Sequence, residues 1–232
     1  GATVMALLDE ATQITAGGLS VSAAQVQRDD SEFGLMPTAY SYASGSGGGL
    51  LVGINASQSD ATIGANVRAA LITGTLLDIS GDVGVFASGS GLAQADVSGL
   101  AAGAFAFGAN KSTATSTGTT LAEVAAVRND AADGTAVDGN FTVSGVGSDG
   151  TFASAEAGAG GIVAGAVASA KTFNTSTTTA TVTSAPMVGG RLAIEARHRA
   201  DLGGSVNSTS ASVVGASGGE AVHSVVSNVT AQ

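Results

Sequence analysis

Short sequence motifs recur along this chain in the same order, once in every unit of about 60 residues, and this repetition constrains the fold most. The first motif reads Gly-x-Φ-x-Φ-x-small, where Φ is an apolar residue. It begins at Gly17, Gly81, Gly139 and Gly190, so successive copies are 64, 58 and 51 residues apart. Stacked repeat proteins are built from such self-similar units, so the pattern predicts a repeat architecture.

Two further motifs follow the same order. Gly-Φ-x-x-Gly occurs at 49–53, 99–103 and 161–165, with a degraded copy at 212–216; Ala/Thr-Thr-Φ begins at Ala2, Ala61, Thr119 and Ala180. We therefore expect each unit to hold three extended stretches, or roughly three coils of about 20 residues. Twelve such coils would make a rod about 55 Å long. The predicted units are 2–60, 61–118, 119–179 and 180–232, within a single domain.

Apolar and polar residues alternate within the stretches, as in Leu19-Ser20-Val21-Ser22-Ala23. This period of two is typical of a half-buried strand. Segments 66–77 and 120–128 leave room for a helical turn or two, but neither has a good cap. The core must be made of small side chains, because the chain has 35 Gly and only 4% aromatic residues. We predict an all-β fold, a right-handed parallel β-helix (β-solenoid), with the handedness taken from the usual crossover preference.

Composition excludes several partners. The net charge is −10 with only 8 Lys and Arg, so nucleic acid is not an expected partner. No apolar run approaches the roughly 18 residues of a membrane-spanning helix, so we expect no membrane insertion. The absence of cysteine is compatible with bacterial secretion. Patterned sequence reaches both Gly1 and Gln232, which predicts either a segment of a longer fibre or rods that stack end to end.

The repeats at 47–57, 139–145 and 160–182 resemble those of large bacterial filamentous adhesins. These include the two-partner-secretion haemagglutinin-like exoproteins and the leukotoxin-type filamentous adhesins. The resemblance covers nearly the whole chain. It implies a long right-handed parallel β-helix on the cell surface and carries over no functional site. The segment 25–43 departs from the pattern and is predicted to be an irregular loop.

Catalytic residues are not predicted. His198 lies in a charged cluster that is typical of a solvated turn, and Ser217 in Gly-Ala-Ser-Gly-Gly lacks the strand and helix that a nucleophile elbow needs. With no Cys nucleophile and few aromatic platforms, the sequence favours a protein that is not an enzyme. A carbohydrate-active β-helix enzyme is the less favoured alternative.

Binding residues are few. Asp29, Asp30 and Glu32 are the best candidates for calcium, although solvated acidic turns are the favoured interpretation, and no other cofactor is expected. Phe33, Tyr40 and Tyr42 make the irregular loop the best candidate for partner contact. Threonine tracts at 112–120 and 172–183 leave ice binding open. Six glycosylation sequons occur, at Asn55, Asn110, Asn140, Asn174, Asn207 and Asn228.

The predicted function is a structural or adhesive rod of a bacterial surface protein, located outside the cell. Its expected partners are its own copies or the rest of a longer chain, and a host or cell-surface glycan or protein. The alternative from a different class is a ligand-binding module for glycan or ice.

Overall fold

The computed structural model describes most of the chain, and every regular element in the described residues is a β-strand. The strand pairings are parallel except for one short antiparallel pair, β4 (Asp29–Asp30) with β5 (Gly34–Leu35). The predicted all-β class with parallel strands is confirmed. The described residues are 2–8, 13–27, 29–30, 34–35, 38–72, 76–125, 128–129, 136–184 and 187–232.

The main sheet stacks the four copies of the first motif directly on one another. Its layers are β3 (Leu19–Gln25), β10 (Val83–Ala102), β14 (Phe141–Asn174) and β16 (Leu192–Val225). The first Φ positions of the four motif copies are register partners: Leu19 with Val83, Val83 with Phe141, and Phe141 with Leu192. The sequence repeat is therefore also the repeat of the hydrogen-bonded ladder.

The prediction of three coils in each unit is wrong. Three coils would pair each strand with one about 20 residues away. In every parallel pairing between the described strands, the partner lies 51 to 64 residues away. One unit thus makes one wide circuit through the sheets. The extended stretches of a unit pair with their counterparts in the next unit, not with each other, so the predicted stack of twelve coils is also wrong.

The remaining strands complete each circuit. Within the main sheet the chain turns and runs back through β7 (Val52–Ile63) or β11 (Phe105–Ser116), or through the second half of β14 or β16. It then passes through a five-stranded sheet and a short three-stranded sheet. In the two segments with a helical alternative, every regular element among the described residues is a strand. The bounds are β6 (Ala39–Gly48), β7 (Val52–Ile63) and β11 (Phe105–Ser116) in the main sheet; β1 (Thr3–Leu8), β8 (Asn66–Leu71), β12 (Thr119–Val124), β15 (Thr177–Val182) and β17 (Asn228–Ala231) in the five-stranded sheet; and β2 (Gln13–Ala16), β9 (Leu76–Ile79) and β13 (Arg128–Asn129).

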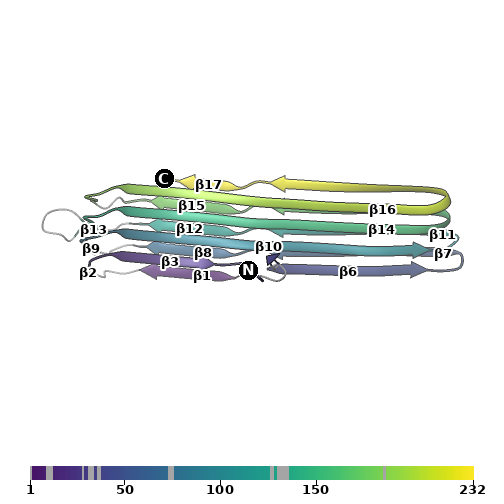
Figure 1. Cartoon of the computed structure of the whole chain (residues 1–232), viewed down its shortest axis with the longest axis horizontal. Coiled ribbons are helices and arrows are strands. Elements are labelled where there is room, and N and C mark those ends of the chain that lie inside the picture. Colours follow the sequence, from purple (N-terminus) through teal and green to yellow (C-terminus); the bar gives the residue numbers. More distant parts are fainter. Residues whose placement is uncertain are drawn as a thin grey trace.

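The long axis of the molecule runs along the strands (Figure 1). The layers stack across that axis, from the purple β1, β3 and β6 to the yellow β16 and β17. β14 and β16 run out to one tip, turn and come back, so that they form a flat arm together with β6, β7, β10 and β11. The length of the body thus comes from strand length, not from the number of layers.

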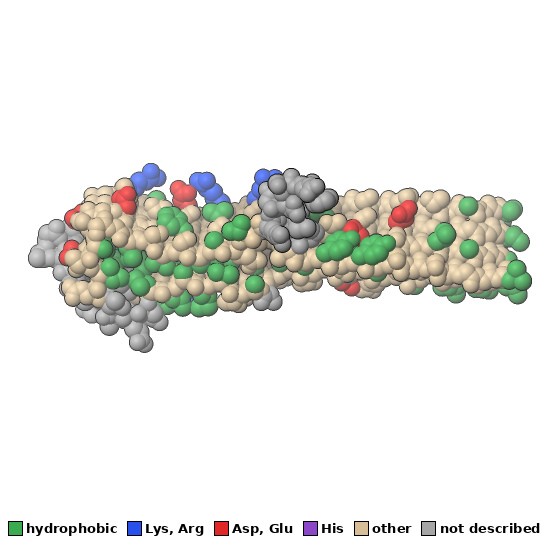
Figure 2. Space-filling model, turned by 60° about the horizontal axis from the view of Figure 1, so that its bottom comes forward, with side chains coloured by type: hydrophobic (Ala, Val, Ile, Leu, Met, Phe, Trp, Pro, Cys, Tyr) green, Lys and Arg blue, Asp and Glu red, His purple; other side chains and the backbone are tan. Residues whose placement is uncertain are grey.

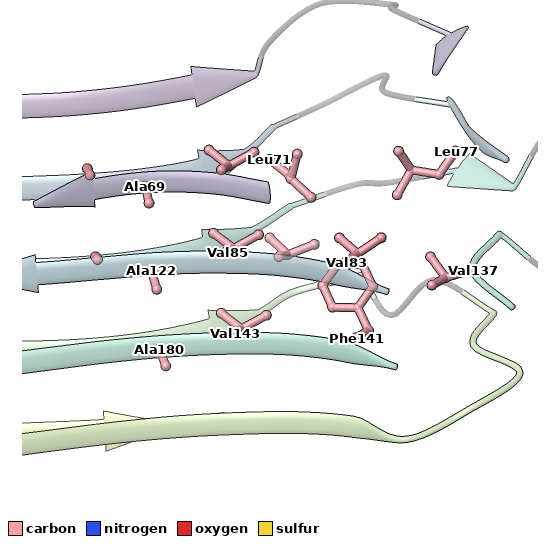
Figure 3. Close-up of a cluster of buried hydrophobic side chains, with 14 of the residues drawn as sticks. Ala69, Leu71, Leu77, Val83, Val85, Ala122, Val137, Phe141, Val143 and Ala180 are labelled. Atoms are coloured by element: carbon pink, nitrogen blue, oxygen red, sulfur yellow. The ribbon is translucent and has the colours of Figure 1, made fainter. Parts of the chain in front are cut away.

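Large side chains fill the core at the end of the body opposite the arm (Figure 3). Phe141 and Leu77 are fully buried there with Leu71, Val85 and Val143. Burying side chains of this size contributes about 1.5–3 kcal/mol each. This end therefore supplies most of the apolar driving force for folding.

Alanine fills the core of the arm. Its inner columns include Ala95, Ala155 and Ala166, all fully or almost fully buried. The outgoing and returning strands of the arm approach so closely near the tip that a Cβ on Gly53 would overlap the Ala102 carbonyl oxygen. Because these residues bury little apolar area, the hydrogen bonds of the continuous parallel ladders must contribute much of the stability of the arm.

Candidate functional site

Two of the three predicted calcium residues lie in a described strand and the third does not. Asp29 and Asp30 form β4, while Glu32 and Phe33 lie outside the described residues. Among the described residues, no three His, Asp or Glu side chains gather in a way that would hold a metal ion. Calcium binding by Asp29, Asp30 and Glu32 therefore stays a prediction.

The predicted irregular loop at 25–43 is wrong at its C-terminal end. Tyr40 and Tyr42 belong to the regular strand β6 and pair in register with Gln94 and Asp96 of β10. The extra residues lie between Gln25 and Ala39, which are 14 positions apart where their register partners on β10, Gly89 and Ala93, are 4 apart. Two tyrosine side chains thus stand on the outer face of a rigid ladder.

Tyr40 and Tyr42 have different electrostatic surroundings although both side chains are more than half exposed. Partial burial, followed by the nearby Asp96 carboxylate, raises the pKa of Tyr40 above its ordinary value of 10.0. Hydrogen bonds with Ser98 and Ser44 lower the pKa of Tyr42 below 10.0. The Tyr42 and Ser98 hydroxyl oxygens are 3.3 Å apart.

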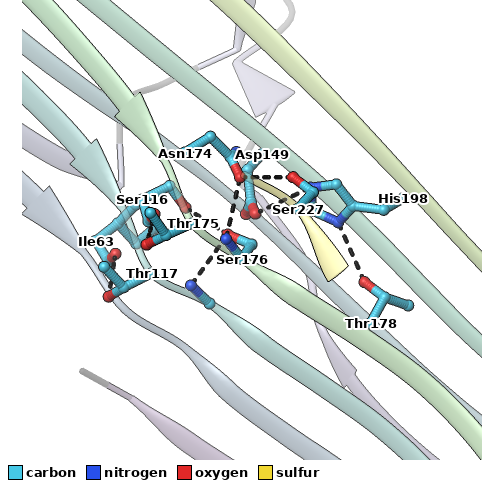
Figure 4. Close-up of polar contacts among 11 residues, drawn as sticks. Ile63, Ser116, Thr117, Asp149, Asn174, Thr175, Ser176, Thr178, His198 and Ser227 are labelled. Carbon is cyan, nitrogen blue, oxygen red and sulfur yellow. Dashed lines mark hydrogen bonds and ion pairs between the residues drawn. The ribbon is translucent and has the colours of Figure 1, made fainter. Parts of the chain in front are cut away.

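His198 lies inside the body, so its predicted place on a charged surface turn is wrong. Its side chain is only 3% exposed, and Nε2 lies 3.7 Å from Oδ2 of Asp149. Its Nδ1 lies 3.1 Å from Oγ1 of Thr178 (Figure 4). The alternation of β16 explains the position: Glu195, Arg197 and Arg199 point outward, which turns His198 inward.

The Thr178–His198–Asp149 group has the residue types of a hydrolytic triad but no room for a substrate. The cavity beside it measures about 10 Å³, which holds at most one water molecule. Ser217, the other candidate nucleophile, lies within β16 opposite Ala166 of β14 and not in a turn between a strand and a helix. Neither group has the geometry that nucleophilic catalysis requires.

A shallow hollow of about 890 Å³ lies on the outer face of β3, β10, β14 and β16. Asp82, Asn140 and Arg191 line it as register neighbours. The main-chain and side-chain amides of Asn140 donate to Oδ1 of Asp82 at 2.7 and 3.2 Å, and the Arg191 main-chain N–H donates to Oδ1 of Asn140 at 3.1 Å. Phe86 adds an aromatic ring that covers Gly84.

The sequence contained a signal for this hollow. Asp82, Asn140 and Arg191 are the second residues of three copies of the first motif, Gly-x-Φ-x-Φ-x-small. Because the copies stack in register, the variable second position becomes one column of side chains on the surface. This column can be predicted from the motif only when each unit is known to make one circuit.

The tip of the arm is apolar (Figure 2). Leu50 and Val213 at the turns are 94% and 84% exposed. Apolar side chains continue from there along the outer face of β7 and β11, where Ile54 and Phe107 are 66% and 50% exposed. A groove of about 520 Å³ runs over this face. Exposed apolar patches of this kind on soluble proteins commonly mark interaction surfaces.

Half of the predicted sequons and much of the threonine face lie in the interior. Asn55, Asn110 and Asn174 are at most 6% exposed, whereas Asn140, Asn207 and Asn228 are exposed. Thr120, Thr172 and Thr178 are also buried. Alternate residues of the two threonine tracts therefore point inward and cannot form part of a flat threonine surface. A folded chain therefore offers three sequons for modification.

Comparisons with models of known families, with curated proteins and with solved structures each find no match. The resemblance to filamentous adhesins stays a prediction. In the described part of the chain, no helix has the length and hydropathy needed to cross a membrane.

Proposed function

We propose that this chain is a segment of a wide parallel β-solenoid that serves as a structural and adhesive rod outside a bacterial cell. One observation carries the proposal: each unit pairs in register with the next, and the outer edge of β16 continues for 34 residues without a partner in the described chain. An edge of that length is a template for a further strand. The natural occupant is another unit of the same kind, from the same chain or from a second copy.

The two sheets have different numbers of layers, and this difference determines where the strands of a second copy would lie. The sheet that contains β17 has five strands in the order β1, β8, β12, β15, β17, whereas the main sheet reaches β16 in its fourth layer. A second copy that pairs its β3 with β16 would bring its own β1 to the place that β17 occupies. Stacking of a second copy on the β16 layer therefore requires the incoming β1 to displace β17.

Deleting residues 227–232 tests this proposal directly. The deletion removes β17 and frees the position for the β1 of another copy. We expect longer filaments, stacked layer on layer, from the shortened chain than from the full chain, measured by negative-stain electron microscopy and sedimentation velocity. If neither form makes filaments at any concentration, self-stacking is refuted, and the edge is left to further units of one chain.

A second candidate function, glycan binding, is favoured by the hollow over β10 and β14. An aromatic ring beside carboxylate and amide groups is a lining that suits a sugar, with stacking on Phe86 and hydroxyl contacts to Asp82. The test is a printed glycan array probed with the chain and with Phe86→Ala. A glycan that loses binding on this substitution but not on Phe152→Ala supports the candidate, and an array without any signal refutes it.

A further inference from the structure

The outer face of the arm opposite β6 carries an ordered pattern of large and small residues. This face, called here the apolar arm face, consists of the outward side chains of β7, β11, residues 163–173 of β14 and residues 214–224 of β16. Ile54, Phe107 and Val167 are each at least half exposed on it. Side chains of this size in water on one face need an explanation beyond the fold of a single chain.

The pattern reverses from one edge of the face to the other. One column, read across the four strands, is Ile54, Phe107, Gly165, Ala216: two large residues followed by two small ones. The next column of the groove is Ala56, Ala109, Val167, Gly218, in which the one large residue lies on the other half.

We propose that a second copy of this chain packs face to face on the apolar arm face, about a two-fold axis that runs along the strands between β11 and β14. Such an axis preserves position along the strand and reverses the order of the strands. β7 then faces β16 of the second copy, and β11 faces its β14. An interface of this kind is isologous, so one surface must be complementary to itself.

The two columns of the groove meet that condition. Ile54 lies opposite the second copy's Ala216, and Phe107 opposite its Gly165. In the next column Val167 lies opposite the second copy's Ala109. Each of these contacts places a large side chain over a small one, which is how two layers of side chains interdigitate at native density.

The size of the face is adequate for a specific dimer. Six outward columns on four strands give 24 positions, and the spacings of about 4.8 Å between strands and 6.8 Å along them give roughly 800 Å² for each copy. A standard interface buries about that area on each partner. The arm is also flat (Figure 1), and flat parallel sheets are typically stabilised by stacking on another sheet.

Charge does not oppose the pairing. The polar columns beside the groove carry Lys111 and Lys171 together with Asp60 and Glu220, so the face is neutral in a chain of net charge −10. Lys171 Nζ already lies 3.5 Å from Oε2 of Glu220. These columns form a polar rim next to an apolar centre, the usual anatomy of an interface.

This dimer is independent of the rod proposed above, because it leaves the edge of β16 open. It pairs bodies side by side, whereas edge pairing extends the stack. The two associations are separable: one yields a closed pair and the other yields filaments.

Substitutions that place opposite charges at Ala56 and Gly218 test the proposed two-fold axis directly. In one chain these positions lie on β7 and β16, three strand spacings or about 14 Å apart. In the dimer each lies opposite the other. A Cβ on Gly218 meets nothing within 4 Å, so the folded chain accepts a substitution there.

Sedimentation velocity over a range of concentrations should show a dimer for the unaltered chain. Ala56→Glu alone and Gly218→Lys alone should each weaken the dimer by about tenfold or more, and the double variant should recover most of that loss. Ser44→Glu with Asn207→Lys places the same charges on the opposite face of the arm and should change nothing.

Three results would overturn the proposal. The first is an unaltered chain that remains a monomer at every concentration. The second is a double variant as weak as the two single variants combined, and the third is an equal loss of dimer in the control pair. Circular dichroism of each variant verifies that the ladder is intact.

Discussion

Burial separates side chains that look alike in the sequence. His198 sits among charged residues in the chain, yet it lies inside the body beside Asp149 and Thr178. Asn174 and Asn228 have the same sequon form, but the first is buried and the second exposed. Alternation along a strand defines which residues share a face. It does not define which of the two faces is the interior where small and polar residues occupy both.

The two tyrosines provide a prediction at this scale, since the chain contains no others. Because hydrogen bonds lower the pKa of Tyr42 while partial burial and Asp96 raise that of Tyr40, we expect two steps in an alkaline titration, one below and one above pH 10.0. Absorbance near 295 nm, in the ultraviolet, measures both. Tyr42→Phe should remove the lower step, and a single step centred on 10 in the unaltered chain would contradict the described surroundings.

The sign of the linked stability follows from these pKa directions. The folded pKa of Tyr42 is lowered, so its ionisation stabilises the fold as pH rises past that pKa. The folded pKa of Tyr40 is raised, so its contribution is present below its unfolded pKa and is lost as pH rises through its folded value. Both side chains are largely solvated, so both effects should be small.

Strands were easier to predict from the sequence than their partners. The first motif pairs with its own copies throughout the main sheet, as its strict form suggests. The second motif does so only in part, because Gly99 pairs with Gly45 and not with Gly49. In the third motif, Ala61 lies in β7 whereas Ala180 lies in β15 of another sheet. A local pattern specifies a strand, but the register depends on turn lengths and on core packing around the whole circuit.

The close approach of the outgoing and returning strands near the tip gives a prediction for Gly53. A methyl group there would overlap the Ala102 carbonyl oxygen, and that backbone has little room to relax. We expect Gly53→Ala to lower the free energy of unfolding by about 1–3 kcal/mol, measured by urea denaturation. Gly48→Ala is the matched control, since its Cβ meets nothing within 4 Å, and should leave stability unchanged within about 1 kcal/mol. Equal effects of the two changes would contradict the packing of the arm.

The end of the body opposite the arm gives a prediction for Phe141, the largest fully buried side chain there. Phe141→Ala leaves a cavity as well as losing apolar burial, so we expect a loss of about 3–5 kcal/mol in the free energy of unfolding. Phe105→Ala removes the same atoms from a half-exposed site on the arm. A smaller loss for Phe105 is the expected result, and the reverse order would place the core elsewhere.

At the scale of the whole molecule, the account depends on the number of residues in one circuit of the chain, called here the step. A step of one full unit makes a flat body of few layers with long strands. It also places Asp82, Asn140 and Arg191 in one column and Phe107 beside Gly165. A step of a third of a unit would give a narrow rod with neither surface. The sequence repeat is compatible with both steps, because it contains the period but not the number of turns in each period.

Disulfide cross-linking measures that step directly, since the chain contains no cysteine of its own. Ser154 and Ser205 are register partners on β14 and β16, 51 residues apart. Neighbouring strands lie about 4.8 Å apart, within the Cα separation that a disulfide accepts. The account predicts that Ser154→Cys with Ser205→Cys forms an intramolecular disulfide on oxidation, seen by mass spectrometry. Ser154→Cys with Thr175→Cys, spaced like one coil of a three-coil unit, should not. Cross-linking of the second pair and not the first would contradict the account.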